Sequence, residues 1–263
     1  MLDSPRRRRL RARVPLAVLA AVPLLGAGCG GTSGPVTLTV LANTSLTEVF
    51  GEIGTAYAQE RPGVRLRLEF GAAPELANRL TRHEPGDVLV TTDLASLDEE
   101  SRYLGPQRRV VALTSMTIAV APGDPRGIRD LRDLTRPGLR VAVGAESVPV
   151  GRYTRQVLAK AGVAVRWSSQ EISARAVLDR VRSGEADAGL VYVTDLASAG
   201  VAASSVPIPA RLNVTAAFPA TSIKDGGHPA ETDEFLSWLV SPDARELFNK
   251  YGFATPAARP AGG

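Results

Sequence analysis

The sequence contains little of the chemistry that metal and redox sites use. Its 263 residues include one cysteine, Cys29, and two histidines, His83 and His228. One cysteine excludes a disulfide within the chain, and no CxxC or HExxH spacing occurs. The GxSxG, Walker and strand-linked GxGxxG motifs of common enzymes are also absent. We therefore expect no direct metal-cation ligands, no cofactor and no enzymatic activity.

Long apolar stretches are scarce as well. The run Val14 to Leu25 is broken by Pro15 and Pro23 and is shorter than the roughly 20 residues of a membrane-spanning helix. Six arginines precede it and small residues follow it, which is the order of a secretory signal peptide. Residues 1–28 are therefore predicted to be a cleaved signal peptide, and the protein is expected outside the cytoplasm.

Cys29 stands directly after these small residues and resembles the cysteine of a bacterial lipobox. In that pattern it becomes the lipidated first residue of the mature protein, although here Gly26 occupies the place where leucine is usual. The alternative is a small apolar residue that is discarded with the leader. We predict that residues 29–35 are a lipidated cysteine and a short tether, which anchor the protein to the cell membrane on its extracytoplasmic side.

The charge balance gives no reason to expect a nucleic-acid partner. The formal net charge is +4, but residues 1–28 carry six arginines and one aspartate, a net +5. The rest of the chain therefore has a formal charge of −1 and shows no basic stripe. Its length of about 230 residues suffices for one large domain or two smaller lobes.

From residue 36 on, short apolar runs alternate with segments of helical period. The first half is predicted to contain strands at Val36–Leu41, Val64–Phe70 and Asp87–Val90, with helices over 46–57 and Pro74–Leu80. A repeated strand-helix order favours a parallel sheet with helices on its faces.

The same order restarts after Met116, which implies a second lobe. Its apolar runs are Thr117–Ala121, Leu139–Val143, Val163–Trp167 and Ala188–Tyr192, and its helices are Gly151–Ala161 and Ala174–Arg182. Two further helices, Thr232–Val240 and Pro242–Tyr251, close the chain. Gly184 is expected to end one helix, and Ser241 with Pro242 to open the last.

Four of the predicted helices begin directly after strands, with hydroxyl-bearing or small residues and few cations. Their starts are Ser45, which has Glu48 three residues on as in a capping box, Ala73, 147–151, and Ser173 with Ala174. Open α/β sheets bind ligands at the carboxyl ends of their strands, and unpaired helix N–H groups suit an anion. Convergence of these starts would form a site for a small, oxygen-rich anion.

Each of these residues also has an ordinary structural interpretation. Ser45 and Ser173 suit N-caps, worth about 1 kcal/mol each. Ala73 and Val150 suit packing positions, and Tyr192 suits a core aromatic. Only their coincidence at successive strand ends favours a binding site.

Nearly the whole chain after the leader, from Val36 to Phe253, resembles the periplasmic molybdate-binding proteins of ABC transporters. The matching segments are 42–47, 85–93, 148–153, 184–195 and 251–253. The resemblance implies an α/β, two-lobed periplasmic-binding-protein fold of type II, each lobe a mostly parallel sheet flanked by helices. Residues 36–115 plus 223–263 would form lobe 1 and residues 116–222 lobe 2, with hinges near Ser115 and Ser222.

The resemblance also implies the ligand and its donors. A monomer would bind molybdate or tungstate in the cleft between the lobes and present it to an ABC permease and its ATPase. The implied oxyanion ligands are N–H groups and hydroxyls of Ser45, Ala73, Val150, Ala174 and Tyr192, with Thr44 as an additional candidate. Ala73 replaces a serine of the family, and the lost hydroxyl would cost roughly 1.5 to 3 kcal/mol of binding.

Other functions stay open at this point. The changed position Ala73 allows sulfate, another oxyanion or a small carboxylate as the ligand, and a sensor lipoprotein of the same fold would need no permease. An enzyme using Asp87, Asp187 or Asp195 as acid or base is the least supported alternative, because no paired nucleophile accompanies them.

Overall fold

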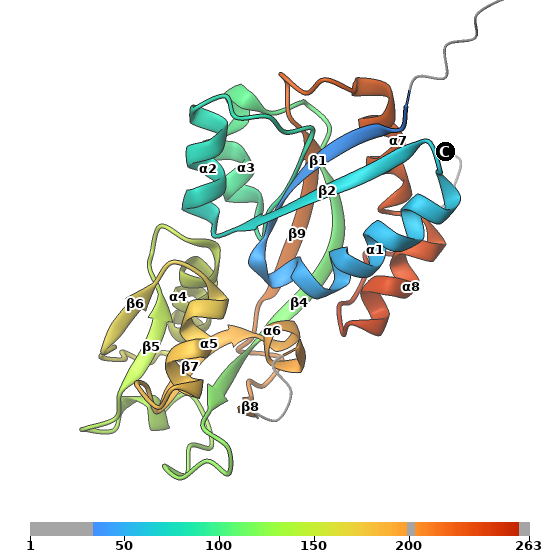
Figure 1. Cartoon of the computed structure of the whole chain (residues 1–263). Helices are drawn as coiled ribbons and strands as arrows, with labels where there is room; N and C mark the ends of the chain where they lie inside the picture. Colours follow the sequence, from blue (N-terminus) through green and yellow to red (C-terminus); the bar gives the residue numbers. More distant parts are fainter. Residues whose placement is uncertain (1–33, 199–202, 258–263) are drawn as a thin grey trace, which may run out of the picture. The chain divides into compact units, whose positions relative to one another are not determined.

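The computed structural model describes residues 34–198 and 203–257 (Figure 1). The predicted signal peptide and Cys29 lie outside the described residues. From Gly34 onward the chain forms one compact unit. No helix within the two described ranges is long and apolar enough to cross a membrane.

The first sheet is built around strand β1 (Val36–Asn43). It pairs in parallel with β2 (Val64–Gly71) and β3 (Val88–Val90), as the strand-helix order predicted. Beyond β3 lie β9 (Thr215–Ser222) and the first half of β4 (Arg109–Val120), both added antiparallel. This part of the sheet is therefore mixed, with its parallel core at β1.

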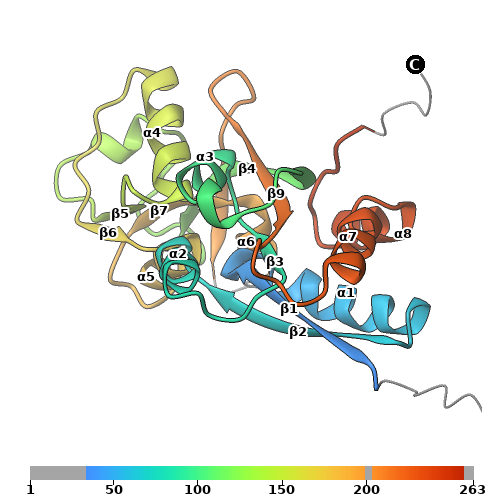
Figure 2. The same ribbon diagram turned by 90° about the horizontal axis from the view of Figure 1, so that it is seen from above.

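Helices cover both faces of this sheet (Figures 1 and 2). One face carries α1 (Thr47–Glu60), α7 (Pro229–Trp238) and α8 (Pro242–Lys250), and the other carries α2 (Ala73–Thr81) and α3 (Leu94–Glu99).

Neighbouring side chains of β1 contribute to apolar clusters on the two opposite faces of the sheet. Val40 lies in the cluster that includes Phe50 of α1, whereas its neighbour Leu41 lies in a separate cluster with Leu76 and Leu80 of α2. Successive side chains of a strand point to opposite faces, so a strand covered on both sides reads as one continuous apolar run.

The second lobe has its own mixed sheet. Strand β5 (Val141–Gly144) pairs in parallel with β6 (Ser169–Glu171) and with β7 (Ala188–Tyr192). The second half of β4 runs antiparallel to β7 and to β8 (Ser204–Pro207). These two sheets with their helices form the predicted two-lobed α/β fold.

The helices of the second lobe are α4 (Pro149–Ala161), α5 (Ala174–Arg182) and α6 (Val193–Ser198). Helix α5 has the bounds that the sequence predicted, and Gly184 follows its end with a positive φ of 74°. Short 3-10 turns occur at Thr44–Leu46, Ser101–Tyr103 and Asp133–Thr135.

The predicted strand Val163–Trp167 is wrong. These residues form no regular structure, and the neighbouring strand is Ser169–Glu171 instead. Val165 is buried without pairing in a sheet, because an apolar loop residue can fill the core as well as a strand residue does.

The chain crosses between the sheets inside β4. Ser115 pairs with Thr215 in the first sheet, and the next residue, Met116, pairs with Tyr192 in the second. Strand β9 lies entirely in the first sheet, up to Ser222 at its end, although the sequence grouped it with residues 116–222. This pairing is between distant segments, so nothing in the local pattern of β9 specifies which sheet it joins.

Candidate anion-binding site

Helix α4 begins immediately beyond the carboxyl end of β5. Its N-cap, Val148, is extended and provides no side-chain cap, and Pro149 has no N–H to satisfy. The N–H groups of Gly151 and Arg152 donate to the Val148 carbonyl, at 3.0 Å each. The N–H of Val150 has no acceptor among the described residues and is therefore available to a ligand.

Two glycines allow α4 to start so close to the strand. A Cβ on Gly151 would lie 1.8 Å from the carbonyl oxygen of Ala145, and one on Gly144 would lie 2.5 Å from a methyl of Val150. Any side chain at Gly151 would therefore displace the first turn of the helix. This requirement could not be predicted from the sequence, because the close contact forms only in the fold.

Helix α5 presents a second free N-terminus. Its N-cap is Ser173, as predicted, and the hydroxyl accepts a hydrogen bond from the N–H of Ala176 at 3.1 Å. The N–H of Ala174 has no acceptor among the described residues. Because helix N-termini carry a partial positive charge, α4 and α5 each offer a favourable end to an anion.

Tyr192 ends strand β7, and its side chain is 1% exposed. Its ring packs edge-on against Tyr153 and Phe218, with centroid distances of 6.2 and 5.8 Å. The hydroxyl has no hydrogen-bond partner among the described residues; Thr92 lies near it without meeting hydrogen-bond geometry. Burial raises the pKa of this hydroxyl well above its usual value, so it remains a neutral donor.

These three donors line one small cavity. Its volume is about 10 Å³, and the residues around it are Asn43, Thr92, Val148, Pro149, Val150, Ile172, Ser173, Ala174 and Tyr192. None of these lining residues is charged. The volume is enough for about one water molecule, so a tetrahedral oxyanion would require the two lobes to separate slightly around it. Asn43 and Thr92 were not predicted from the sequence, although each lies two residues beyond the end of a predicted strand.

Ser45 does not act as the predicted N-cap of α1. It lies in the 3-10 turn before that helix, whose N-cap is Leu46 with no side-chain bond. The Ser45 N–H donates to the side chain of Asn43 at 3.1 Å, and its hydroxyl donates to Oδ2 of Asp195 at 3.1 Å. Both of its donors thus have partners within the protein. The adjacent Thr44 hydroxyl is buried and has no partner among the described residues.

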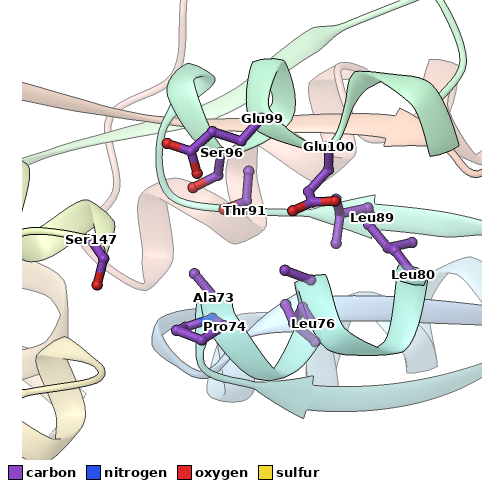
Figure 3. Close-up of a pocket in the computed structure, with 11 residues that line it drawn as sticks. Ala73, Pro74, Leu76, Leu80, Leu89, Thr91, Ser96, Glu99, Glu100 and Ser147 are labelled. Atoms are coloured by element: carbon purple, nitrogen blue, oxygen red, sulfur yellow. The ribbon is translucent and has the colours of Figure 1, made fainter. Parts of the chain in front are cut away.

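Ala73 and Ser45 line cavities other than the one that contains Tyr192. Ala73 is the first residue of α2, and its N–H has no acceptor among the described residues. It borders a cavity of about 200 Å³ together with Ser147 of the second lobe (Figure 3). Ser45 borders a third cavity, of about 420 Å³. The structure therefore brings together Val150, Ala174 and Tyr192 of the five predicted ligands.

Asp195, on α6 of the second lobe, accepts a hydrogen bond from Ser45 of the first lobe. Burial raises its pKa to about 6, against the opposing effects of Arg175 and of the Ser45 hydroxyl. The Arg175 Nε lies 3.2 Å from Asp195 Oδ1, and the same guanidinium also pairs with Glu48 of the first lobe. The Ser45–Asp195 hydrogen bond and the Arg175–Glu48 ion pair thus join the two lobes on this side of the cleft.

Arg152 makes a second connection between the lobes, from α4 to α3. Its Nε lies 2.7 Å from Asp93 Oδ2, and its Nη2 lies 2.8 Å from the Ser96 hydroxyl. The Asp93 side chain is 7% exposed and also caps α3 through the Ser96 N–H, at 2.9 Å. An exposed ion pair contributes little to stability. The Arg152–Asp93 pair is partly buried, and each side chain makes a further hydrogen bond, so its contribution should be larger.

The other aspartates considered from the sequence hold strands in place. Asp87 accepts a hydrogen bond from the Thr39 N–H at 2.7 Å, and Asp187 pairs with Arg140 at 2.9 Å. His83 lies beside Asp225 at 3.0 Å, and His228 lies 3.3 Å from Asp87. Among the described residues no group of three or more histidine, cysteine or acidic side chains could hold a metal ion.

The cavity between the two lobes is bordered by the N-termini of α4 and α5 and by residues at or just beyond the ends of β1 and β3. Residues 38–254 match the family of bacterial extracellular solute-binding proteins, and the chain belongs to that family. It is a substrate-binding protein of the ModA-like kind, as the resemblance predicted. The molybdate-binding protein ModA of Mycobacterium tuberculosis (strain H37Rv) is 34% identical over 229 residues, covering 86% of this chain and 88% of the relative.

One further relative and two solved structures are also similar to this chain. The molybdate-binding protein ModA of Escherichia coli K12 is 29% identical over 242 residues, covering 82% of this chain and 88% of its own. The Azotobacter vinelandii periplasmic molybdate-binding protein has a TM-score of 0.69 at 20% identity, covering 83% of this chain and 99% of its own. The sulfate-binding protein SubI of M. tuberculosis H37Rv has a TM-score of 0.72 at 18% identity, covering 86% and 88%. At these identities the solved structures establish the fold alone.

Proposed function

We propose that this chain is the molybdate-binding component of an ABC importer, that it also binds tungstate, and that it delivers the anion to a membrane permease. The observation that carries the proposal is the convergence of the α4 and α5 N-termini and the Tyr192 hydroxyl on one cavity. The relatives named for molybdate binding, at up to 34% identity, support the choice of anion.

The donor set suits an oxyanion that is fully deprotonated at neutral pH. Val150 and Ala174 offer N–H groups at positive helix ends, and Tyr192 offers a neutral hydroxyl. A fixed shell of donors favours an anion of matching radius, because a smaller one leaves buried groups unpaired. Selectivity would then come from size and donor geometry without a neutralising Lys or Arg.

Closure of the lobes would complete the site. Arg152 and Arg175 each follow one of the ligand-binding helix starts and reach carboxylates of the first lobe, at Asp93 and Glu48. An anion that binds between the lobes favours the closed form in proportion to its higher affinity for it. A permease that recognises only the closed form would then receive only loaded protein.

Isothermal titration of protein lacking residues 1–29 tests the class and the ligand together, with molybdate, tungstate, sulfate and phosphate in one buffer. We expect one-to-one binding of molybdate and tungstate and at least about 100-fold weaker binding of sulfate. Absence of measurable binding of all four anions would refute the proposal.

Sulfate is included because the Synechococcus elongatus sulfate-binding protein is a relative at 21% identity. If sulfate bound most tightly, the chain would be an importer component for that anion instead.

The variant Ala73→Ser tests whether the N-terminus of α2 contributes to the anion-binding site. Tighter anion binding by the variant would place residue 73 among the anion ligands. Unchanged binding would mean that only the donors around Tyr192 bind the anion.

The membrane anchor is part of the same proposal. Lipidated Cys29 would hold the protein near its permease, and Cys29→Ala is expected to move it from the membrane fraction to the soluble extracytoplasmic fraction. Retention of Cys29→Ala protein on membranes would contradict lipid anchoring at this residue, without affecting the proposed ligand.

A further inference from the structure

A second cavity, of about 200 Å³, lies between helices α2 and α3 of the first lobe and is bordered at one end by Ser147 of the second lobe (Figure 3). The residues lining it include none of those around the cavity of Tyr192. Three leucines form its apolar floor: Leu76 and Leu80 from α2 and Leu89 from β3, each 3% exposed. An engineered apolar cavity of about 150 Å³ accepts benzene, so this volume is enough for an organic group of about six heavy atoms.

Two polar groups that border the cavity on the same side as Leu89 have no partner within the described residues. Thr91 is 2% exposed, and its hydroxyl has no hydrogen-bond partner among the described residues. Oε2 of Glu100 is also buried and without a partner, and Figure 3 shows this carboxylate directed into the cavity above Leu76. A buried acceptor without a partner is unfavourable, and a donor that enters the cavity would pair with it.

The charges around the cavity leave one carboxylate without a counterion. Glu99 lies at the mouth with a 59% exposed side chain, and its Oε1 lies 3.5 Å from Arg152 Nη1. Glu100 has no such partner among the described residues, and no Lys, Arg or His is among those that line the cavity. The cavity therefore favours a cation and disfavours an anion.

We propose that this cavity is a second binding site, which takes a small primary ammonium compound with a short alkyl body. The ammonium N–H groups would donate to Glu100 and Thr91, and the alkyl group would cover Leu76, Leu80 and Leu89. A primary ammonium suits the site because it has three donors for separate acceptors, whereas a quaternary ammonium has none. Its two acceptors, Glu100 and Thr91, are not among the residues around Tyr192, although Ala73, the candidate anion ligand on α2, also borders this cavity.

The test uses 3-methylbutylammonium chloride as the probe, titrated into the protein lacking residues 1–29 and followed by NMR chemical shifts. The matched controls are 3-methylbutanol, which has the same carbon skeleton without charge, and 3-methylbutanoate, which carries the opposite charge. We expect saturable one-to-one binding of the ammonium, with both controls weaker by about tenfold or more. Equal binding of ammonium and alcohol would overturn the proposal.

Variants locate the binding and separate it from loss of folding. Glu100→Gln keeps the size of the side chain, and it should weaken the ammonium by about tenfold or more while leaving the alcohol unchanged. Ala77→Leu should block both probes by filling the cavity from α2. Glu246→Gln is the control, because Glu246 is exposed on α8, which lies on the other face of the first sheet. Unchanged ammonium binding by Glu100→Gln would refute the site.

The same variants distinguish this proposal from the proposed function. Molybdate titration of Glu100→Gln should match the unmodified protein, because Glu100 lies outside the anion cavity. Ammonium binding without molybdate binding would leave the second site standing and remove the first. Molybdate binding without ammonium binding would do the reverse.

Discussion

The hydroxyl of Ser45 donates to Asp195 across a distance of 3.1 Å and joins the two lobes beside the end of β1. Asp195 has no solvent exposure, and Arg175 is its other partner, at 3.2 Å. This carboxylate therefore combines burial, a hydrogen bond and an ion pair at the edge of the candidate site. We expect its ionisation to change the stability of the folded protein.

Ionisation of Asp195 should lower stability between about pH 4 and pH 6. Its pKa is raised from 3.8 to about 6, mainly by burial, so the folded protein holds a proton in this range that the unfolded chain has lost. Stability must then fall as pH rises, by about 3 kcal/mol in total. Relative to Asp195→Asn, which cannot ionise, unfolding free energies measured by urea from pH 4 to 7 should show this loss. Parallel pH profiles for the two proteins would contradict the assignment.

Tyr192→Phe should weaken anion binding without destabilising the protein. The hydroxyl is buried without a partner, so its removal costs the free protein nothing and can stabilise it by up to about 1 kcal/mol. The anion loses one donor, which corresponds to roughly a tenfold lower affinity in titration.

Tyr57→Phe is the matched control for this change. Tyr57 is also fully buried with an unpartnered hydroxyl, but it packs against Phe235 and Trp238, away from the anion cavity. The affinity of the Tyr57→Phe variant for the anion should equal that of the unmodified protein. Equal weakening in the two variants would show that the effect is not local to the site.

Gly151→Ala should displace the start of α4 and abolish anion binding. The new Cβ would lie 1.8 Å from the Ala145 carbonyl oxygen, so the first turn must move away from β5. We expect a loss of about 2 kcal/mol or more in stability and at least about 100-fold in affinity. Gly51→Ala in α1 is the control, since nothing lies within 4 Å of its Cβ and alanine should gain about 0.5 to 1 kcal/mol there. Thermal unfolding and titration of both variants check the contrast.

Arg152→Met should weaken anion binding by destabilising the closed arrangement of the lobes. It removes the ion pair with Asp93 and leaves that 7% exposed carboxylate with only its capping bond. A loss of about 1 to 2 kcal/mol corresponds to roughly 5- to 30-fold in affinity, mostly through faster release. Arg180→Met, whose partners Glu171 and Glu185 lie in its own lobe, should change affinity less than twofold. Stopped-flow release rates would separate these outcomes, and equal rates would exclude the interlobe role.

Much of the local structure could be predicted because it depends on neighbouring residues. The apolar segment Val36–Leu41 predicted the strand β1, and Ser173 and Ser241 predicted the N-caps of α5 and α8. The family could also be recognised, since its motifs extend over nearly the whole chain. Val163–Trp167 was mistaken for a strand because apolar loops and strands share a composition.

The sequence by itself determined most of the strands and helices, the N-caps of α5 and α8, and the family, because hydrophobic period and capping chemistry act over a few residues. The tertiary structure alone decided that β9 joins the first sheet and that Ser45 donates to Asp195, 150 positions away. It also decided which helix starts meet at one cavity and that Glu100 and Thr91 remain unpaired in another. These outcomes depend on how distant segments pack, and packing is a property of the whole fold.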